Sequence, residues 1–222
     1  MRRRIHFACA AVGLFASTAI SSTPAAASPC TNLQSVQLRD TTITSATDNT
    51  SGVFTPPGST PITGLPPFCR VTATLTPSSD SSIAIEVWLP ESGWNGRFLG
   101  TGGGGFQGVI TYTELAAGIS AGFATTNSDL GTGSSGCNPL FCGSDGNMGN
   151  PLAIAFGDPA AASTGLFGHP ERIKDFGYRA IHLMTVRGKE IGSAFYKQKA
   201  HRSYFAGCST GGTTKHQTPH RA

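Results

Sequence analysis

The sequence predicts an α/β domain with a mixed or parallel sheet, and three features of the chain support this prediction. Residues 70–76 and 82–89 alternate apolar and polar side chains around the turn-forming residues 77–80, which is the pattern of a β-hairpin. Two short strands further along are separated by a short helical segment. A long helix at 171–199 then leads directly into a short strand at 203–206. Such alternation of strands and helices is typical of sheets that contain parallel pairs.

The segment before the hairpin, residues 28–67, is rich in Thr, Ser and Pro and has few apolar residues. We therefore expect it to wrap the surface of the domain. Cys30 and Cys69 bracket this segment, and a disulfide between them would hold it in place. In the chain-entropy model, closing a loop of roughly 40 residues stabilises the fold by about 4 kcal/mol.

After the hairpin we expect a strand at 96–100, a helix at 111–117 and a strand at 121–126. Residues 127–170 repeat Gly, Ser and Asn and are predicted to be irregular, and connections of that length are usually functional or disordered. The helix at 171–199 is the clearest element, because apolar residues recur near the helical period. They are Ile173, Phe176, Ala180, Ile181, Met184 and Ile191.

The first 27 residues have the organisation of a secretory signal peptide. Three arginines at 2–4 precede an apolar stretch at 7–20, and three alanines at 25–27 supply a cleavage site before Ser28. A membrane anchor is the alternative, but the apolar run is too short and too rich in Ala and Ser. We expect residues 28–222 to be exported, without membrane association once the signal is removed.

Charge and cysteine content exclude some partners. The whole chain has a net charge of +4, and removing the three signal-peptide arginines leaves 4 − 3 = +1. No dense basic stripe with interleaved aromatic residues supports nucleic-acid binding. No His and Cys residues cluster at the spacing of zinc ligands, so no metal cofactor is expected.

Five cysteines follow the signal peptide, and an odd count in an exported protein leaves one of them without an internal partner. Cys137 and Cys142 enclose only four residues, so a local disulfide is expected between them. The remaining thiol either pairs between chains or is a buried free cysteine that packs as a small apolar residue.

The motif that carries chemistry is Gly207-Cys208-Ser209-Thr210-Gly211, which has the pattern G-x-S-x-G. This pattern is typical of a nucleophile elbow, where a serine stands at a sharp turn between a strand and a helix. Residues 213–222 contain no Asp or Glu and include a proline, so we do not expect them to form the helix of the elbow. We expect the chain to stop, or to leave its reading frame, just past Ser209.

A glycine run at 102–105 follows the strand at 96–100. Glycines at the end of a strand allow backbone N–H groups to face a ligand. In an acyl-transfer site such a loop supplies one oxyanion donor, and the residue after the nucleophile, Thr210, supplies the other. A flexible turn is the alternative. A P-loop is excluded, because no Gly-Lys-Ser/Thr follows.

Together these residues resemble the tannase and feruloyl esterase family of serine esterases. The resemblance runs from about Cys30 to Gly212, and its most specific part is the cysteine directly before Ser209. The matching segments are 94–100 leading into 102–105, then 122–126, 176–182 and 204–212. The resemblance implies an α/β-hydrolase core and hydrolysis of esters of phenolic or aromatic acids, with a small aromatic ester as the substrate.

The resemblance also implies roles for individual residues. Ser209 would be the nucleophile, and the N–H groups of Thr210 and of Gly103 or Gly104 would form the oxyanion hole. Cys208 would belong to the disulfide that ties the nucleophile to a cysteine beside the catalytic histidine, and would be the odd cysteine. The acid, the histidine, that second cysteine, the lid domain and its calcium site have no counterpart here. The implied fold is therefore an incomplete α/β-hydrolase core, up to the elbow, over residues 28–212.

Other polar residues have weaker functional interpretations. His216 and His220 lie on the turn behind the elbow, where a histidine points away from the serine, so neither is expected to act as the base. His182 is expected to pack in the core. Asp129 is a loop acid without a partner that the sequence reveals, and Asp175 is expected to be a first-turn helix acid favoured by the helix dipole.

Three functions remain open. The chain is the N-terminal part of a secreted aromatic-ester hydrolase, or a catalytically inactive secreted protein with a binding or scaffold role. Alternatively, it works only after association with a separate polypeptide that carries the acid and the base. In each case the strand before Ser209 is expected to lie at an unpaired edge of the sheet.

Overall fold

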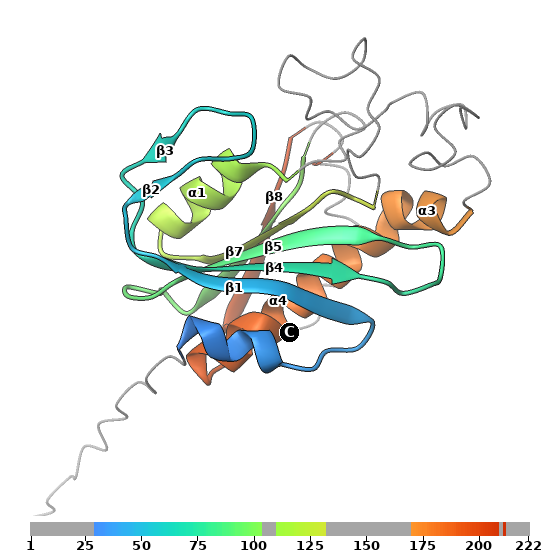
Figure 1. The fold of residues 1–222 in the computed structure, drawn as a ribbon, viewed down its shortest axis with the longest axis horizontal. Coiled ribbons are helices and arrows are strands. Elements are labelled where there is room, and N and C mark those ends of the chain that lie inside the picture. The colour runs from blue at the N-terminus through green and yellow to red at the C-terminus, as the bar shows by residue number, and fades with distance from the viewer. Residues whose placement is uncertain (1–28, 104–109, 132–169, 209–210, 212–222) are drawn as a thin grey trace, which may run out of the picture.

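The computed structural model describes residues 29–103, 110–131, 170–208 and 211 (Figure 1). Six strands form the main sheet, and their bounds are β1 (Thr41–Asn49), β4 (Phe68–Leu75), β5 (Ile83–Pro90), β6 (Arg97–Thr101), β7 (Ala124–Ser128) and β8 (Arg202–Ala206). A separate pair consists of β2 (Val53–Phe54) and β3 (Ile62–Thr63). The helices are the 3-10 helix η1 (Cys30–Ser35), α1 (Tyr112–Ser120), α3 (Pro170–Lys174), the π-helical turn η3 (Asp175–Arg179) and α4 (Ala180–Tyr196).

The main sheet is mixed, as the sequence predicts. Its order is β1-β4-β5-β7-β6-β8; the pairs from β1 to β7 are antiparallel, and β7, β6 and β8 are parallel to one another. The hairpin prediction is confirmed by the continuous antiparallel pairing of β4 with β5. Parallel neighbours require crossover connections, and α1 and α4 supply them before β7 and β8.

Helices cover both faces of the sheet, with α1 on one side and α4 on the other (Figure 1). Strand β5 shows how the sequence encodes the two faces, because successive side chains of a strand point to opposite sides. Val87 and Leu89 pack in the same core cluster as residues of α4, whereas Trp88 packs with residues of α1. A central strand buried on both faces is typical of a three-layer α/β arrangement.

The prediction that residues 28–67 merely wrap the surface is wrong in part. Strand β1 adds to the edge of the sheet beside β4, and Cys30 and Leu33 of η1 are buried in the core. This strand was not predicted from the sequence, because its side chains are mainly small and polar and show no hydrophobic alternation. An edge strand needs few apolar residues, and here the Thr44 and Thr72 hydroxyls lie 2.7 Å apart across the pair.

The predicted helix at 171–199 begins at Pro170 and ends at Tyr196, but it is interrupted by the π-helical turn η3. Asp175, which opens this turn, is fully buried and accepts a hydrogen bond from Arg179 Nε. Asp175 lies beyond the first turn of the helix, which begins at Pro170, so the expectation of a first-turn acid is not met. The helix ends where Lys197 adopts a left-handed conformation, with φ 54°.

Strand β8 lies at the edge of the sheet, as expected for the strand before Ser209. Among the strands that the structure describes, β8 pairs with β6 alone. The Tyr204 side chain on this strand is 43% exposed, although it makes an edge-to-face contact with Phe123. An edge of this kind is available for pairing with another strand.

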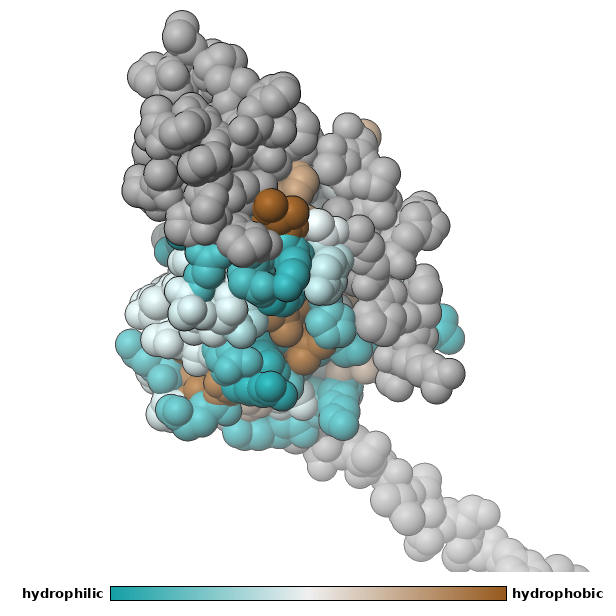
Figure 2. Space-filling model, turned by 90° about the vertical axis from the view of Figure 1, so that its right-hand side faces the viewer, coloured by the Kyte–Doolittle hydropathy of each residue, from teal (hydrophilic) through white to brown (hydrophobic). Residues whose placement is uncertain are grey.

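The end of the molecule that carries α3 is mainly hydrophilic, with separate hydrophobic residues between the polar ones (Figure 2). Ile173, in α3, is one of the large apolar residues exposed to solvent. Isolated apolar residues of this kind are normal on a protein surface. No helix within the described ranges is long and apolar enough to cross a membrane.

Candidate functional site

The two motifs singled out in the sequence leave the sheet side by side. Strands β6 and β8 run parallel, and their last paired residues are Thr101 and Ala206. The ladder continues for one more bond, since the backbone N–H of Gly102 donates to the Ala206 carbonyl at 2.9 Å. The carboxyl edge of parallel strands is where α/β proteins bind their ligands.

Beyond the strands, the glycine run and the elbow motif are in direct backbone contact. A Cβ built on Gly211 would lie 2.0 Å from the Gly103 carbonyl oxygen, and one built on Gly102 would lie 2.9 Å from the Gly211 Cα. Real side chains do not tolerate such distances, so glycine is required at 102 and 211. The fold therefore joins two motifs that lie about a hundred residues apart in the chain.

The structure describes some of the predicted site residues. Gly103 is half-buried beside Gly211, and Cys208 is a free, exposed thiol. The predicted disulfide between Cys30 and Cys69 is present, with an S–S distance of 2.00 Å. Ser209, Thr210, Gly104, Cys137 and Cys142 lie outside the described residues, so their predicted roles stay predictions.

Asn127 is a polar residue of this edge that the sequence analysis missed. Its side chain is fully buried at the end of β7. The Nδ2 group donates to the Thr101 carbonyl at 3.0 Å and to the Thr101 hydroxyl at 2.8 Å, and Oδ1 accepts from the Thr111 N–H at 2.9 Å. An asparagine among the buried residues of a strand was the available signal, since a buried amide needs partners.

A buried carboxyl follows the same strand. Asp129 Oδ1 accepts hydrogen bonds from the backbone N–H groups of Ala84 and Gly131, at 2.9 and 2.8 Å. Burial raises the pKa of Asp129 to about 7, the two N–H donors oppose this shift, and the negative charge of Asp175 adds to it. These partners were not predictable from the sequence, because one of them lies 45 positions earlier in the chain.

A second buried carboxylate, Glu86, holds the first turn of α1 against the sheet. It accepts hydrogen bonds from Arg70 Nε and Trp88 Nε1, both at 2.8 Å, and from the Tyr112 hydroxyl at 3.0 Å. Burial and the adjacent Glu86 carboxylate raise the pKa of Tyr112. Three side chains therefore supply the hydrogen bonds that the buried Glu86 carboxylate needs, and one of them, Tyr112, belongs to α1. We assign Glu86 and these partners a structural role in placing α1.

The described histidines do not complete a catalytic site. His201 precedes β8 and stacks on Gly96, at the amino edge of the sheet. The five residues of β8 separate it from the elbow by about 16 Å, at about 3.3 Å per residue. His182 is half-buried near the start of α4, where the sequence predicts a packing role.

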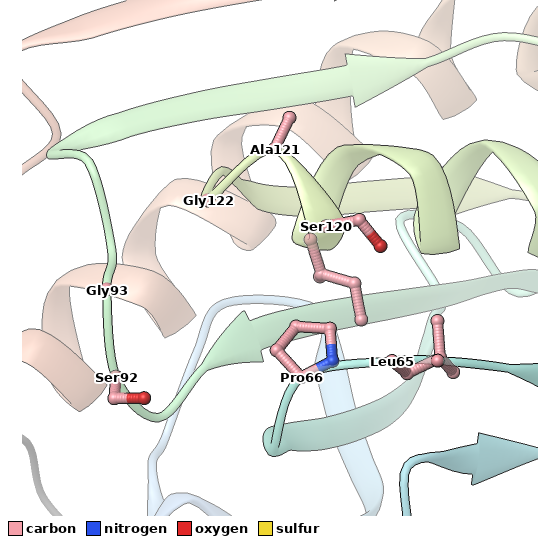
Figure 3. Close-up of a pocket in the computed structure, with 9 residues that line it drawn as sticks. Leu65, Pro66, Ser92, Gly93, Ser120, Ala121 and Gly122 are labelled. Atoms are coloured by element: carbon pink, nitrogen blue, oxygen red, sulfur yellow. The ribbon is translucent and has the colours of Figure 1, made fainter.

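The described residues also form a shallow pocket of about 590 Å³ (Figure 3). Residues 64–66 and 92–93 line it together with residues 119–122 at the end of α1. Since α1 ends on the amino side of β7, this pocket opens at the opposite edge of the sheet from Gly102.

One group of possible metal ligands occurs in the described part of the chain, and it does not fit an ion. The ligand atoms of Cys30, Asp48 and Cys69 lie within 4.8 Å of one another. The two sulfur atoms form the disulfide, however, and zinc binds thiolates rather than disulfide sulfur.

Comparison with known proteins identifies the family to which this chain is similar. A model of the family described as tannase and feruloyl esterase matches residues 69–216. An uncharacterized esterase from Xanthomonas campestris pv. campestris is 37% identical over 194 residues, which cover 87% of this chain and 30% of that protein.

Two crystal structures of proteins from Aspergillus oryzae are similar to the structure of this chain. Feruloyl esterase B superimposes with a TM-score of 0.65 and 31% identity, over 83% of this chain and 32% of the other. A second esterase gives the same TM-score with 28% identity, over 83% and 33%. The chain thus spans about a third of the length of the proteins it matches, and its six-stranded mixed sheet matches the corresponding part of the feruloyl esterase fold.

Proposed function

Because this chain belongs to the tannase and feruloyl esterase family, we propose that it supplies the nucleophile and the oxyanion hole of a secreted serine carboxylic-ester hydrolase. The observation that carries the proposal is the backbone contact between Gly102, Gly103 and Gly211. Gly103 or Gly104 is one proposed oxyanion donor, and Gly211 lies two residues after Ser209 in the sequence. The contact therefore joins the two segments that carry the proposed donors and nucleophile. In this proposal residues 28–212 are the N-terminal part of an α/β-hydrolase core.

The proposed reaction proceeds through an acyl-serine. Ser209 Oγ attacks the ester carbonyl carbon, and the Oγ proton passes to a base as the carbonyl oxygen becomes an oxyanion. The N–H groups of Thr210 and of Gly103 or Gly104 stabilise that oxyanion. Its collapse expels the alcohol with a proton, and water then hydrolyses the acyl-serine to release the acid.

We place the acid and the base of this reaction in the part of the family domain that this chain does not span. The chain covers 30% of the Xanthomonas esterase and 32% of feruloyl esterase B. A protein with the nucleophile but no base is expected to turn over roughly a millionfold more slowly than a complete triad. Among the described strands β8 pairs with β6 alone, and this favours a second candidate, in which a separate polypeptide pairs with β8 and supplies the missing groups.

The proposed substrates are esters of aromatic acids, which is supported by the similarity to a feruloyl esterase. Export is supported by the Cys30–Cys69 disulfide, because such bonds persist in oxidising compartments. In this proposal residues 1–27 are the signal peptide, and residues 213–222 are a tail outside the catalytic domain.

The test is hydrolysis of methyl ferulate and of an activated aryl acetate by residues 28–222. We expect slow hydrolysis that falls in Ser209→Ala and is unchanged in Ser203→Ala, a matched control on the exposed strand β8. Equal hydrolysis by Ser209→Ala and by the unsubstituted chain would refute the assignment of the nucleophile. Turnover at the rate of a complete family member would show that the base lies within this chain.

A further inference from the structure

One buried side chain, Asn127, contacts the residues on both sides of the segment 102–110, which contains the glycine run. Thr101 is the last residue of β6, directly before Gly102, and Thr111 is the residue directly before α1. Asn127 donates to both oxygen atoms of Thr101 and accepts from the backbone of Thr111. A single carboxamide therefore joins the two chain ends that flank residues 102–110.

The chemistry of this contact requires a carboxamide. At Thr101 the partners are a carbonyl and a hydroxyl that accept, and at Thr111 the partner is an N–H that donates. Asparagine has two N–H donors and a carbonyl acceptor in one plane, whereas a carboxylate has no donor. Asn127 is fully buried, so bulk water does not compete for these hydrogen bonds in the fold.

Further hydrogen bonds fix Asn127 and Thr101 to the centre of the sheet. The Thr101 hydroxyl donates to the Thr126 carbonyl at 3.0 Å, and the Thr126 hydroxyl donates to the Glu86 carbonyl at 2.9 Å. Hydrogen bonds arranged in such a chain reinforce one another in a buried environment. The network thus runs from β5 through β7 to the end of β6.

The position of Thr101 determines where the next two residues lie. Gly102 follows it, bonds to Ala206, and approaches Gly211 so closely that a Cβ would lie 2.9 Å from the Gly211 Cα. Gly103 comes next, with its carbonyl oxygen against Gly211. A displacement of about 1 Å at Thr101 would be passed to both residues, because the contacts leave no space to absorb it.

We propose that Asn127 is a positioning residue that sets the glycine run against the elbow and so places the oxyanion donor relative to Ser209. Its significance for catalysis rests on the proposed function, but its effect on the backbone at Gly102 does not. The residue acts through Thr101 and Thr111 and need not touch substrate.

Two variants separate the contacts of Asn127, and a third provides the control. Asn127→Asp keeps an acceptor for the Thr111 N–H and, in its ionised form, has no donor for Thr101. Thr101→Val removes the hydroxyl group that accepts a hydrogen bond from Asn127 Nδ2. Thr125→Val is the matched control, because Thr125 is fully buried on the same face of β7 and its hydroxyl contacts Leu115 of α1 instead.

The first readout is amide hydrogen exchange of residues 28–222, resolved at Gly102 and Thr111. In Asn127→Asp we expect exchange at Gly102 to rise about tenfold, the effect of losing one hydrogen bond of typical strength, while Thr111 changes less. Thr101→Val should also raise exchange at Gly102. Thr125→Val should leave both amides unchanged. If Gly102 responds equally to Asn127→Asp and Thr125→Val, the proposal is wrong.

The second readout is the Ser209-dependent hydrolysis of an activated aryl acetate. A misplaced donor should lower kcat up to about a hundredfold in Asn127→Asp with little change in KM, because oxyanion contacts form mainly in the transition state. An unchanged kcat would refute the link to the oxyanion donor. If exchange at Gly102 rises but hydrolysis never depends on Ser209, the positioning role stands and the proposed function fails.

Discussion

The contact between the glycine run and the elbow predicts that Gly211→Ala destabilises the protein. The alanine Cβ would lie 2.0 Å from the Gly103 carbonyl oxygen and 2.8 Å from the Gly102 carbonyl carbon. Ordinary contacts of a Cβ begin at about 3.4 Å, so the two backbones must separate by more than 1 Å. Overpacking of this kind typically costs about 1–3 kcal/mol.

Gly177→Ala is the matched control for this substitution. Gly177 lies in the π-helical turn η3, and a Cβ there would meet nothing within 4 Å. Replacing a helical glycine with alanine is expected to stabilise the fold by about 0.5–1 kcal/mol. The two glycine-to-alanine changes should therefore shift stability in opposite directions.

Urea unfolding of residues 28–222 measures both effects. With an m value of about 2 kcal/mol/M, a loss of 2 kcal/mol lowers the midpoint by about 1 M. Exchange of the Gly102 amide should also rise in Gly211→Ala, since its bond to the Ala206 carbonyl lies beside the clash. If Gly211→Ala leaves both the midpoint and this exchange unchanged, the two motifs are not in contact and the reasoning is refuted.

Two further predictions concern the core. The pKa of Asp129 is about 7 in the folded protein and 3.8 in the unfolded chain, a difference that corresponds to about 4 kcal/mol. Because the folded state binds the proton more tightly, this contribution to stability is fully present below pH 4 and is lost as the pH rises to about 7. Asp129→Asn should remove that part of the pH dependence of unfolding, and an unchanged profile would contradict the assignment. Replacing Cys30 and Cys69 together with serine should cost about 4 kcal/mol through the 39-residue loop that they close, whereas Cys208→Ser, at a free and exposed thiol, should cost little in the same unfolding assay.

Periodicity in the sequence predicted the central part of the fold. The hairpin β4–β5 and the helix α4 follow from clear alternation and helical spacing, and both are present. Strand β1 was missed because an edge strand can be built from small polar residues that carry no hydrophobic signal. The π-helical turn was missed because hydrophobic periodicity carries no sign of it or of the ion pair between Asp175 and Arg179 that spans it.

The candidate site was predictable where it depends on local chemistry. Gly102 and Gly211 belong to motifs that the sequence displays, and the structure shows that they touch. The hydrogen bonds of Asn127 and Asp129 near this edge were not predictable. They join segments that are distant in the sequence and become neighbours only when the strands assemble into the sheet. Long-range pairing of that kind leaves no pattern in a single sequence.

The most direct test of the central claim is to map where an aryl phosphonate ester bonds to residues 28–222, using mass spectrometry. Phosphonylation builds negative charge on the phosphoryl oxygen, so oxyanion donors accelerate it at the serine beside them. We expect a slow, single adduct on Ser209 that forms more slowly in Gly211→Ala than in Gly177→Ala. Adducts distributed over exposed serines such as Ser203, or equal rates in the two glycine variants, would contradict it.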